Sequence, residues 1–363
     1  MESLISSTQN PKIKSLLTLQ QKSSERRKTG LFVVEGRREL EHCIEAGYEV
    51  ECLFVNDDLR LMIDEYGEKS SGITHHSSVI NHHSSVINPH SSVINPHSSI
   101  ISLKSSILNH HSPIYPVSPH VYERIAYRGS TEGIVAVVHA KRHAIDDLRL
   151  MTDEYGEKSS IINPHSSVLN PHSSILNPHS SVLNPHSSIL NPHSSVLNPH
   201  SSIINHQSSI KSPLYIVLES VEKPGNLGAV LRSADAAGAD GVIVCDPLTD
   251  LYNPNLIRAS IGAVFSVPVA TCTSEECIAW LKAQGIRILT AQLQDSKLYY
   301  DTDMCAPTAI VMGTESTGLT EPWRQAADAH IRIPMLGKLD SLNVSVSAAI
   351  LLFEAVRQRK NNT

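Results

Sequence analysis

The residues best suited to chemistry lie in three short stretches of the carboxyl-terminal part of the chain. The first contains the glycines of GNLG at 225–228 and, four residues further on, Arg232. Glycines let a backbone approach a ligand closely, and the start of a following helix offers amide groups to an anion. Arg232 would lie near the mouth of that loop. Most such glycines only make turns, however, and most arginines on helices are solvated, so this stretch alone is a weak sign of a binding site.

The second and third stretches also combine a loop with polar side chains. The sequence AIVMGTESTGLT at 309–320 indicates an apolar strand that runs into a loop. Residues 332–360 indicate an apolar segment, a polar loop and a long amphipathic helix that starts near Asn343. Either Ser341 or Asn343 could cap that helix by accepting a backbone hydrogen bond. The loop of the second stretch contains Gly313, Glu315 and Gly318.

Alternating strands and helices are expected to position these stretches. Buried strands are predicted at 214–221 (LYIVLESV) and at 240–246 (DGVIVCD), with the glycine stretch and a helix between them. A strand, a glycine-bearing loop, a helix and a second strand form one βα unit of a parallel sheet. The fold class expected for this part of the chain is therefore α/β with a parallel sheet.

Composition excludes some classes of protein. The 363 residues carry a net charge of −6, and 18% of them are charged, below the roughly 25% of typical globular domains. No run of about 18 apolar residues occurs, so we expect no membrane span. The start of the chain lacks the apolar core of a secretory signal. Overall acidity argues against a nonspecific DNA coat but allows a local nucleic-acid surface.

The six cysteines give no sign of a disulfide framework. They are scattered along the chain and form no CxxC pair. Free thiols in a reducing cytoplasm explain them better than disulfide bonds do. The cysteines are Cys43, Cys52, Cys245, Cys272, Cys277 and Cys305.

Two tracts, 72–112 and 161–211, differ from the rest of the chain. They hold 15 of the 20 histidines with many Ser, Asn and Pro residues, and the second repeats Asn-Pro-His-Ser-Ser-Val/Ile-Leu every seven residues. Proline in every repeat excludes a coiled coil, because each proline removes an amide donor and clashes with the preceding turn. Regular histidines can bind metals, but no acidic residue or cysteine accompanies these. We therefore predict disordered insertions without a catalytic role.

The amino-terminal part is expected to form a smaller α/β domain. Residues 8–47 indicate two helices around a strand at 31–36, and further strands are predicted at 50–58 and 130–142. Eight Lys or Arg residues and only four Glu lie between Asn10 and Glu41. A phosphate-binding face and an ordinary solvated helix surface explain this local charge equally well. The eight cations are Lys12, Lys14, Lys22, Arg26, Arg27, Lys28, Arg37 and Arg38.

Three motifs occur in a fixed order near the carboxyl end. They are N-x-G-x-x-x-R at Asn226–Arg232, M-G-x-E-x-x-G at Met312–Gly318 and I-P-M…S-L-N-V-S-x-S-x-A at Ile333–Ala348. With this combination the sequence resembles the SpoU (TrmH-like) family of RNA ribose 2′-O-methyltransferases, within the SPOUT superfamily. The resemblance runs from Pro213 to the end, and NPKIK…FVVEG near the start resembles the family's RNA-binding domain more loosely. The two repeat tracts depart from the family pattern but leave the motifs intact.

The resemblance implies a fold and a cofactor. The carboxyl-terminal segment of the parallel sheet would be threaded through a loop as a trefoil knot, built from the 313–318 loop and the 333–345 segment. The knot would hold S-adenosylmethionine (SAM), and a homodimer would complete the active site. Small or apolar residues leave backbone groups free to contact adenine and ribose. The cofactor-binding residues implied are Gly313, Ile333 and Leu342.

The resemblance also implies catalytic residues. They are Arg232, Asn226, Glu315, Asn343 and Ser345. A guanidinium with a pKa above about 12 is a poor general base, so Arg232 would clamp a phosphate or stabilise the developing alkoxide. A proton relay through Ser345 or a water is an alternative. The amides and Glu315 would fix the loops and Arg232, or would simply tie the loops together as buried polar groups.

These inferences divide the chain into three parts. Residues 1–142 would form a small α/β domain that binds the RNA substrate, interrupted by an insertion at about 60–115. Residues 143–211 would be a repeat-rich interdomain insertion, and residues 212–363 the SpoU-type catalytic domain. The expected protein is a cytoplasmic SAM-dependent enzyme that methylates rRNA or tRNA, with RNA and a second copy of itself as partners and with no metal and no membrane.

Two other functions are consistent with parts of the sequence. An RNA-binding protein of the same fold without catalytic activity is one, because the repeat-rich segment could disturb docking of the two domains. A nucleotide-binding α/β enzyme that uses GNLG as a dinucleotide loop is the other. GNLGAVLR lacks the GxGxxG spacing, and no acidic ribose-binding residue is evident.

Overall fold

The computed structural model describes residues 3–56, 112–126, 133–148, 212–314 and 316–361. Apart from Ser112, both repeat tracts lie outside these ranges, so the prediction that they are disordered concerns residues outside the described part. Glu315 also lies outside it. Among the described residues, no helix is long and apolar enough to cross a membrane.

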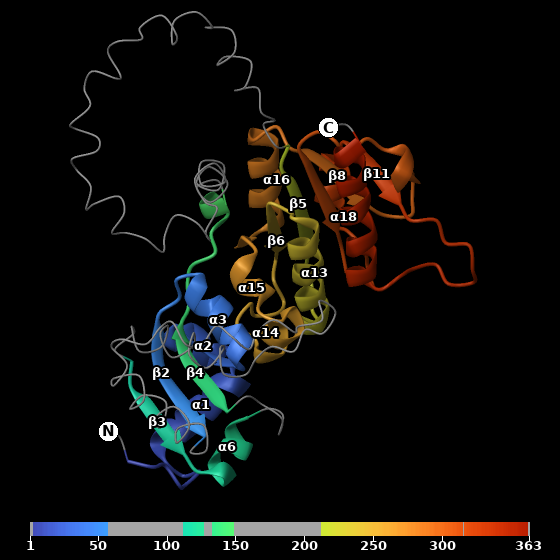
Figure 1. Ribbon diagram of the computed structural model, residues 1–363. Coiled ribbons are helices and arrows are strands. Elements are labelled where there is room, and N and C mark those ends of the chain that lie inside the picture. Colours follow the sequence, from blue (N-terminus) through green and yellow to red (C-terminus); the bar gives the residue numbers. More distant parts are fainter. Residues whose placement is uncertain (1–2, 57–111, 127–132, 149–211, 315, 362–363) are drawn as a thin grey trace, which may run out of the picture.

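The amino-terminal part forms a four-stranded sheet with the order β1-β4-β2-β3 (Figure 1). Strand β4 pairs antiparallel with β1 and β2, and β3 pairs parallel with β2. Within each of the predicted ranges 31–36, 50–58 and 130–142, the described residues contain one strand. The elements in chain order are α1 (Pro11–Gln21), α2 (Ser23–Thr29), β1 (Leu31–Glu35), α3 (Arg37–Glu45), β2 (Val50–Asn56), β3 (Ile114–Val117), α6 (Pro119–Ile125) and β4 (Ile134–His139).

Two features of this part differ from the prediction. The first expected helix is two helices, because Lys22 adopts an extended backbone (φ −114°, ψ 111°) that ends α1 and precedes α2. Strand β3 and helix α6 lie directly after the first repeat tract and were not predicted. Helix α1 begins as its sequence indicates, since the Asn10 side chain accepts a hydrogen bond from the Lys12 amide and Pro11 occupies the first turn.

The carboxyl-terminal part forms a seven-stranded sheet with the order β7-β6-β5-β10-β8-β11-β9. Every neighbouring pair in it is parallel, which confirms the α/β fold class with a parallel sheet. The trefoil knot stays a prediction.

The elements of the carboxyl-terminal part, in chain order, are β5 (Leu214–Glu219), α13 (Pro224–Ala237), β6 (Gly241–Cys245), α14 (Pro254–Ser260), α15 (Ala263–Ser266), β7 (Val269–Cys272), α16 (Ser274–Ala283), β8 (Arg287–Ala291), β9 (Lys297–Leu298), a 3₁₀ turn (Tyr299–Asp301), β10 (Thr308–Met312), α17 (Glu321–Ala326), β11 (Ala329–Arg332) and α18 (Val344–Asn361).

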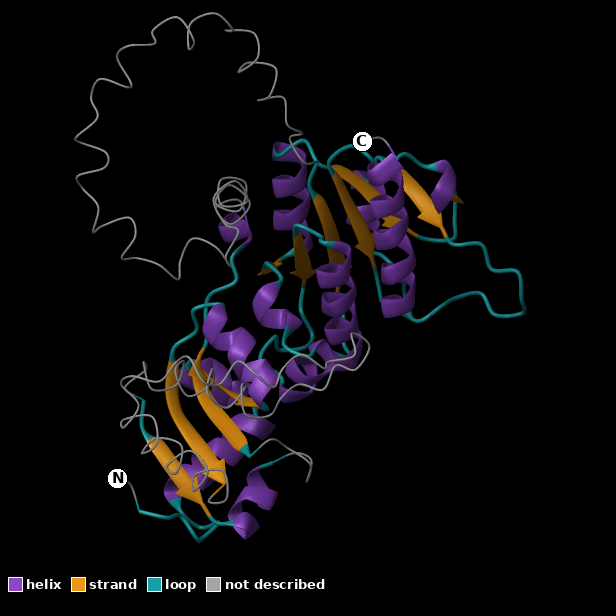
Figure 2. Ribbon diagram, in the orientation of Figure 1, coloured by secondary structure: helices purple, strands orange, loops and turns teal. Residues whose placement is uncertain are grey.

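Helices cover both faces of this sheet (Figure 2). Alternate residues of a strand point to opposite faces, and β5 follows this rule. Ile216 and Leu218 join a core with α13, α14 and α18, whereas Tyr215 and Val217 join a second core with α16 and α17. Because both faces are buried, the strands are apolar throughout, as expected for a parallel sheet.

The GNLG stretch is not a loop, contrary to the prediction. Helix α13 already begins at Pro224, so residues 225–228 form its first turns. Gly228 serves packing rather than ligand approach, because a Cβ there would lie 2.6 Å from the Ala259 Cβ and 2.8 Å from the Ser260 amide nitrogen of α14. Two helices pack this closely only where one of them has no side chain.

An ion pair and an aromatic stack join the two sheets. The buried Arg26 of α2 donates to the Asp250 carboxylate at 2.6 Å and to the Leu19 carbonyl at 2.6 Å. The ring of Phe32 on β1 stacks on Tyr252 with 4.2 Å between centroids. Arg26 therefore belongs to this interface and not to a phosphate-binding face, which removes one of the eight cations from that hypothesis.

We predict that Arg26→Ala lowers the free energy of unfolding by about 3 kcal/mol, because it leaves the Asp250 carboxylate without its buried partner. Urea denaturation followed by circular dichroism measures the change. Arg27→Ala is the matched control, since Arg27 is the next residue of the same helix and is exposed; its effect should stay within about 0.5 kcal/mol. Equal effects of the two substitutions would contradict the role assigned to the ion pair.

Candidate active site

A pocket lies at the carboxyl ends of the neighbouring strands β5 and β10. In the strand order of the sheet, β6 and β7 lie beyond β5, whereas β8, β11 and β9 lie beyond β10 in the opposite direction. The strand order therefore changes direction between β5 and β10. Ligands of open α/β sheets bind at such a change in strand order. The pocket encloses about 120 Å³, far more than one water needs. Its lining residues are Leu218, Glu219, Ser220, Val221, Glu222, Lys223, Asn226, Gly313, Thr314, Ser316 and Val344.

Gly313 lines the pocket where the loop after β10 folds back on itself. A Cβ on Gly313 would lie 2.2 Å from the carbonyl carbon of Gly318 and 2.5 Å from the Leu319 nitrogen. The loop is closed by hydrogen bonds in both directions between the backbones of Thr314 and Gly318. Gly318 has φ +68°, a conformation that glycine adopts readily. Only a glycine at 313 therefore allows this loop.

A chain of hydrogen bonds joins the starts of α13 and α18 beside the pocket. The Asn343 Nδ2 donates to the Asn226 Oδ1 at 3.1 Å. The Asn343 Oδ1 accepts from the Ser345 amide at 3.0 Å and from the Ser345 Oγ at 2.5 Å. Asn343 is therefore the residue that caps α18, one of the two candidates from the sequence, Ser341 and Asn343. The amide nitrogen of the same side chain holds Asn226. Three of the predicted site residues are brought together here.

Arg232 lies elsewhere on α13. It follows Asn226 by six residues, about 9 Å along the helix axis, and it is not among the residues that line the pocket. Its side chain is exposed, and its guanidinium makes no hydrogen bond or ion pair with any described residue. Within one chain, therefore, the structure does not bring Arg232 to the pocket.

The remaining predicted residues are placed differently. Ile333 is partly buried against the core that includes α18, and Leu342 is 38% exposed just before Asn343. Neither lines the pocket. The segment between β11 and α18, which carries both, runs out from the body as a long loop (Figure 1). In this loop, Leu336 is 97% exposed and Leu339 is 76% exposed. Glu315 lies outside the described residues.

Glu219, a residue of the pocket lining that was not predicted, carries a buried carboxylate. The Glu219 carboxylate accepts hydrogen bonds from the Thr320 amide (2.9 Å), the Thr320 hydroxyl (2.6 Å) and the Ser274 hydroxyl (3.2 Å). These bonds tie the end of the loop after β10 to β5 and α16. The sequence offers one sign of this residue, since Glu219 is the single acidic residue at the end of the otherwise apolar strand LYIVLE.

Ser220, the next residue, also lines the pocket and was not predicted. It has φ +51°, a left-handed backbone conformation that is unfavourable for residues with a side chain. Its amide donates to the Cys245 carbonyl at 2.9 Å, which fixes this turn. Strain of this kind is concentrated at functional sites.

Two family models match this chain, one in its carboxyl-terminal part and one in its amino-terminal part. Residues 213–353 match the model of the SpoU rRNA methylase family, and residues 10–136 match an MRM3-like substrate-binding domain. The first range contains every described residue of the pocket and all three motifs.

Curated relatives match the carboxyl-terminal part. The chain is 40% identical over 150 residues to the 23S rRNA (guanosine-2′-O-)-methyltransferase RlmB of Vibrio parahaemolyticus, covering 41% of this chain and 61% of that protein. It is also 40% identical over 150 residues to the tRNA (guanosine(18)-2′-O)-methyltransferase of Escherichia coli, covering 41% and 65%. The matches thus span less than two thirds of the relatives' own length.

A solved structure matches nearly the whole chain. It is the crystal structure of an RNA 2′-O ribose methyltransferase, with 28% sequence identity and a TM-score of 0.62. The match covers 99% of this chain and 100% of the chain of that methyltransferase. The motifs, the pocket at the carboxyl ends of β5 and β10, and the matches to both parts agree. Residues 213–353 therefore form a domain of the SpoU methylase family.

Proposed function

We propose that this protein transfers a methyl group from S-adenosylmethionine to a ribose 2′-hydroxyl of rRNA or tRNA. The observation that carries the proposal is the pocket beside the Asn226–Asn343–Ser345 hydrogen bonds, within the part of the chain that matches the SpoU family. The names of the relatives favour RNA as the substrate. A reducing cytoplasm, where such RNA and free thiols occur together, is the compartment that we propose.

The pocket residues fit a ligand such as SAM. Val221 and Val344 provide apolar surface for an adenosine, and Gly313 keeps the loop close without a side chain. Glu222 and Lys223 place opposite charges at the pocket, which suits a zwitterion that also carries a sulfonium. When bound, this group supplies an activated methyl. Ile333 and Leu342, as the resemblance implies, would complete the cofactor site from the loop before α18.

The protein's own groups must orient the acceptor hydroxyl and receive its proton. Much of the rate then comes from holding the hydroxyl in line with the methyl group. We propose that Arg232 stabilises the developing alkoxide or clamps the neighbouring phosphate, since a guanidinium donates and does not accept protons. Asn226 and Asn343 position the ends of α13 and α18, Ser345 provides a path for the proton, and Glu315 fixes the loop.

A homodimer is part of this proposal. Because Arg232 lies outside the pocket of its own chain, a second copy is needed to bring a guanidinium to the reacting atoms. Helix α18 carries an apolar stripe suited to such a contact, with Val346 and Phe353 each 47% exposed and seven residues apart. Residues seven apart lie on the same helix face. Exposed apolar patches of this kind mark protein interfaces.

The direct test of activity uses the purified chain, labelled SAM and total RNA from cells that lack the gene. We expect label in a ribose 2′-O-methyl position, which alkaline-resistant dinucleotides reveal. Labelled rRNA and labelled tRNA distinguish the two substrate classes. RNA binding without any label would instead identify the inactive RNA-binding alternative.

We predict that Gly313→Ala abolishes measurable SAM binding, because the new Cβ cannot fit 2.2 Å from the Gly318 carbonyl carbon. Isothermal titration calorimetry measures the affinity. Gly225→Ala is the matched control: a Cβ there meets nothing within 4 Å, so the Kd should change by less than about twofold. Wild-type affinity in Gly313→Ala would show that the loop does not form the cofactor site.

We predict that Arg232→Ala lowers kcat for methyl transfer by at least about 100-fold while the Kd for SAM stays within about threefold, because a donor to developing charge acts in the transition state. Single-turnover methylation and calorimetry give the two values. Lys282→Ala on α16 removes an exposed cation on the opposite side of the sheet and should leave both unchanged. A variant with more than a third of the wild-type rate would exclude Arg232 from the reaction.

We predict that Phe353→Glu converts a dimer into a monomer, because a charge would be buried at the contact. Light scattering after size-exclusion chromatography reports the mass. Leu248→Glu, which changes a 63% exposed leucine in the loop after β6, should remain dimeric. A wild-type protein that is monomeric at micromolar concentration would remove the dimer from the proposal.

A further inference from the structure

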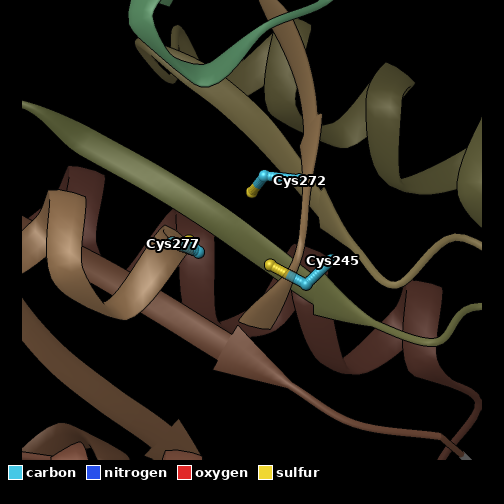
Figure 3. Close-up of side chains that lie close together, drawn as sticks. All are labelled: Cys245, Cys272 and Cys277. Atoms are coloured by element: carbon cyan, nitrogen blue, oxygen red, sulfur yellow. The ribbon is translucent and has the colours of Figure 1, made fainter. Parts of the chain in front are cut away.

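Three of the six cysteines lie together in the carboxyl-terminal part. The Sγ atoms of Cys245, Cys272 and Cys277 are all within 4.8 Å of one another (Figure 3). Cys245 and Cys277 are fully buried, and Cys272 is partly exposed on the edge strand β7. The cluster was not predicted, because the three cysteines form no CxxC pair in the sequence.

The fold itself determines the position of the three sulfurs. Cys245 ends β6 and Cys272 ends β7, and they are register partners, so their side chains lie on the same face of the sheet. The chain then turns directly into α16, which a capping box between Thr273 and Glu276 holds at its first turn. Cys277 is the fourth residue of that helix and packs onto the same face. Two strands and one helix therefore present one sulfur each.

This spacing is close to that of a metal site. Three sulfurs that each lie about 2.3 Å from a common ion are about 3.8–4.0 Å apart. Sulfurs within 4.8 Å need shifts of only some tenths of an ångström to reach it. Thiolates are the ligands that Cu(I) and Zn(II) prefer, and three of them leave a fourth position open on a tetrahedral ion.

Two carboxylates near the cluster also suit a cation. The Asp246 carboxylate accepts hydrogen bonds from the Ser274 amide (3.1 Å) and the Ser274 hydroxyl (2.6 Å), and the Glu276 carboxylate accepts one from the Thr273 amide (2.8 Å). Asp246 directly follows Cys245, and Glu276 directly precedes Cys277. A bound metal ion would place positive charge near these two carboxylates.

We propose that Cys245, Cys272 and Cys277 form a binding site for one thiophilic metal ion, Zn(II) or Cu(I). As each metal–sulfur bond forms, a protonated thiol loses its proton to solvent, and no electron is transferred. The ion would fasten the edge strand β7 and helix α16 to β6. Cys245 is the register partner of Glu219, which lines the pocket, so this tie would lie next to the candidate active site.

The test uses the full-length protein purified without chelator under a reducing, oxygen-free atmosphere. Cd(II) is the probe, because thiolate-to-cadmium charge transfer absorbs in the ultraviolet. We expect one equivalent to bind with a submicromolar Kd. Competition with Zn(II) in one arm and with Cu(I) in another then shows which of the two ions the site prefers.

Variants decide whether the three sulfurs are the ligands. Cys272→Ser changes the partly exposed member and is expected to fold as the wild type does, which circular dichroism checks. Its Cd(II) affinity should fall more than about 100-fold, since even an outer-shell partner of a metal is worth 10–100-fold. Cys245→Ser should behave likewise. Cys305→Ser, which changes a partly buried cysteine of the same part of the chain, should bind as the wild type does.

Three results would overturn the proposal. One is the absence of stoichiometric binding to the reduced wild-type protein. Another is undiminished binding in a folded Cys272→Ser variant. The third is a disulfide within the cluster, seen by mass spectrometry as the loss of two hydrogens, in protein that takes up no metal after reduction.

Discussion

The loop after β10 closes where only a glycine fits, and the candidate site depends on that closure. Gly313 lies so near the backbone of Gly318 that no side chain can stand between them. The two hydrogen bonds between Thr314 and Gly318 and the bonds of Thr320 to the Glu219 carboxylate hold the loop against β5. The strand ends, the loop and the start of α13 then enclose one space. The pocket is thus a consequence of strand order and of a single missing Cβ.

Polar contacts at helix starts connect this space to the rest of the domain. Asn343 caps α18 and holds Asn226 on α13 through the other end of the same amide. An amide side chain can do both, because it carries a donor and an acceptor. A shift of α18 is therefore transmitted to the pocket. The same helix carries the exposed apolar stripe, so in the dimer that we propose, association with a second copy would act on the pocket through α18.

The sequence predicted the parallel α/β sheet and a cap at either Ser341 or Asn343, because apolar runs and capping residues are local signals. It placed GNLG in a loop, whereas Pro224 starts the helix earlier and Gly228 packs on α14. Arg26 was one of eight candidate cations for a phosphate-binding face, but it pairs with Asp250, more than 200 residues away. The contacts of Glu219 and the cluster of three cysteines were not predicted for the same reason. Strand register and helix packing create them, and both are tertiary properties.

Hydrogen–deuterium exchange with and without SAM tests the central claim most directly. If the loop after β10, the end of β5 and the start of α18 enclose the cofactor, amides within 218–226, 313–320 and 343–347 should exchange more slowly when SAM is bound. Amides of the small amino-terminal sheet should not change. Protection confined to other parts of the chain, or none at saturating SAM, would contradict the account.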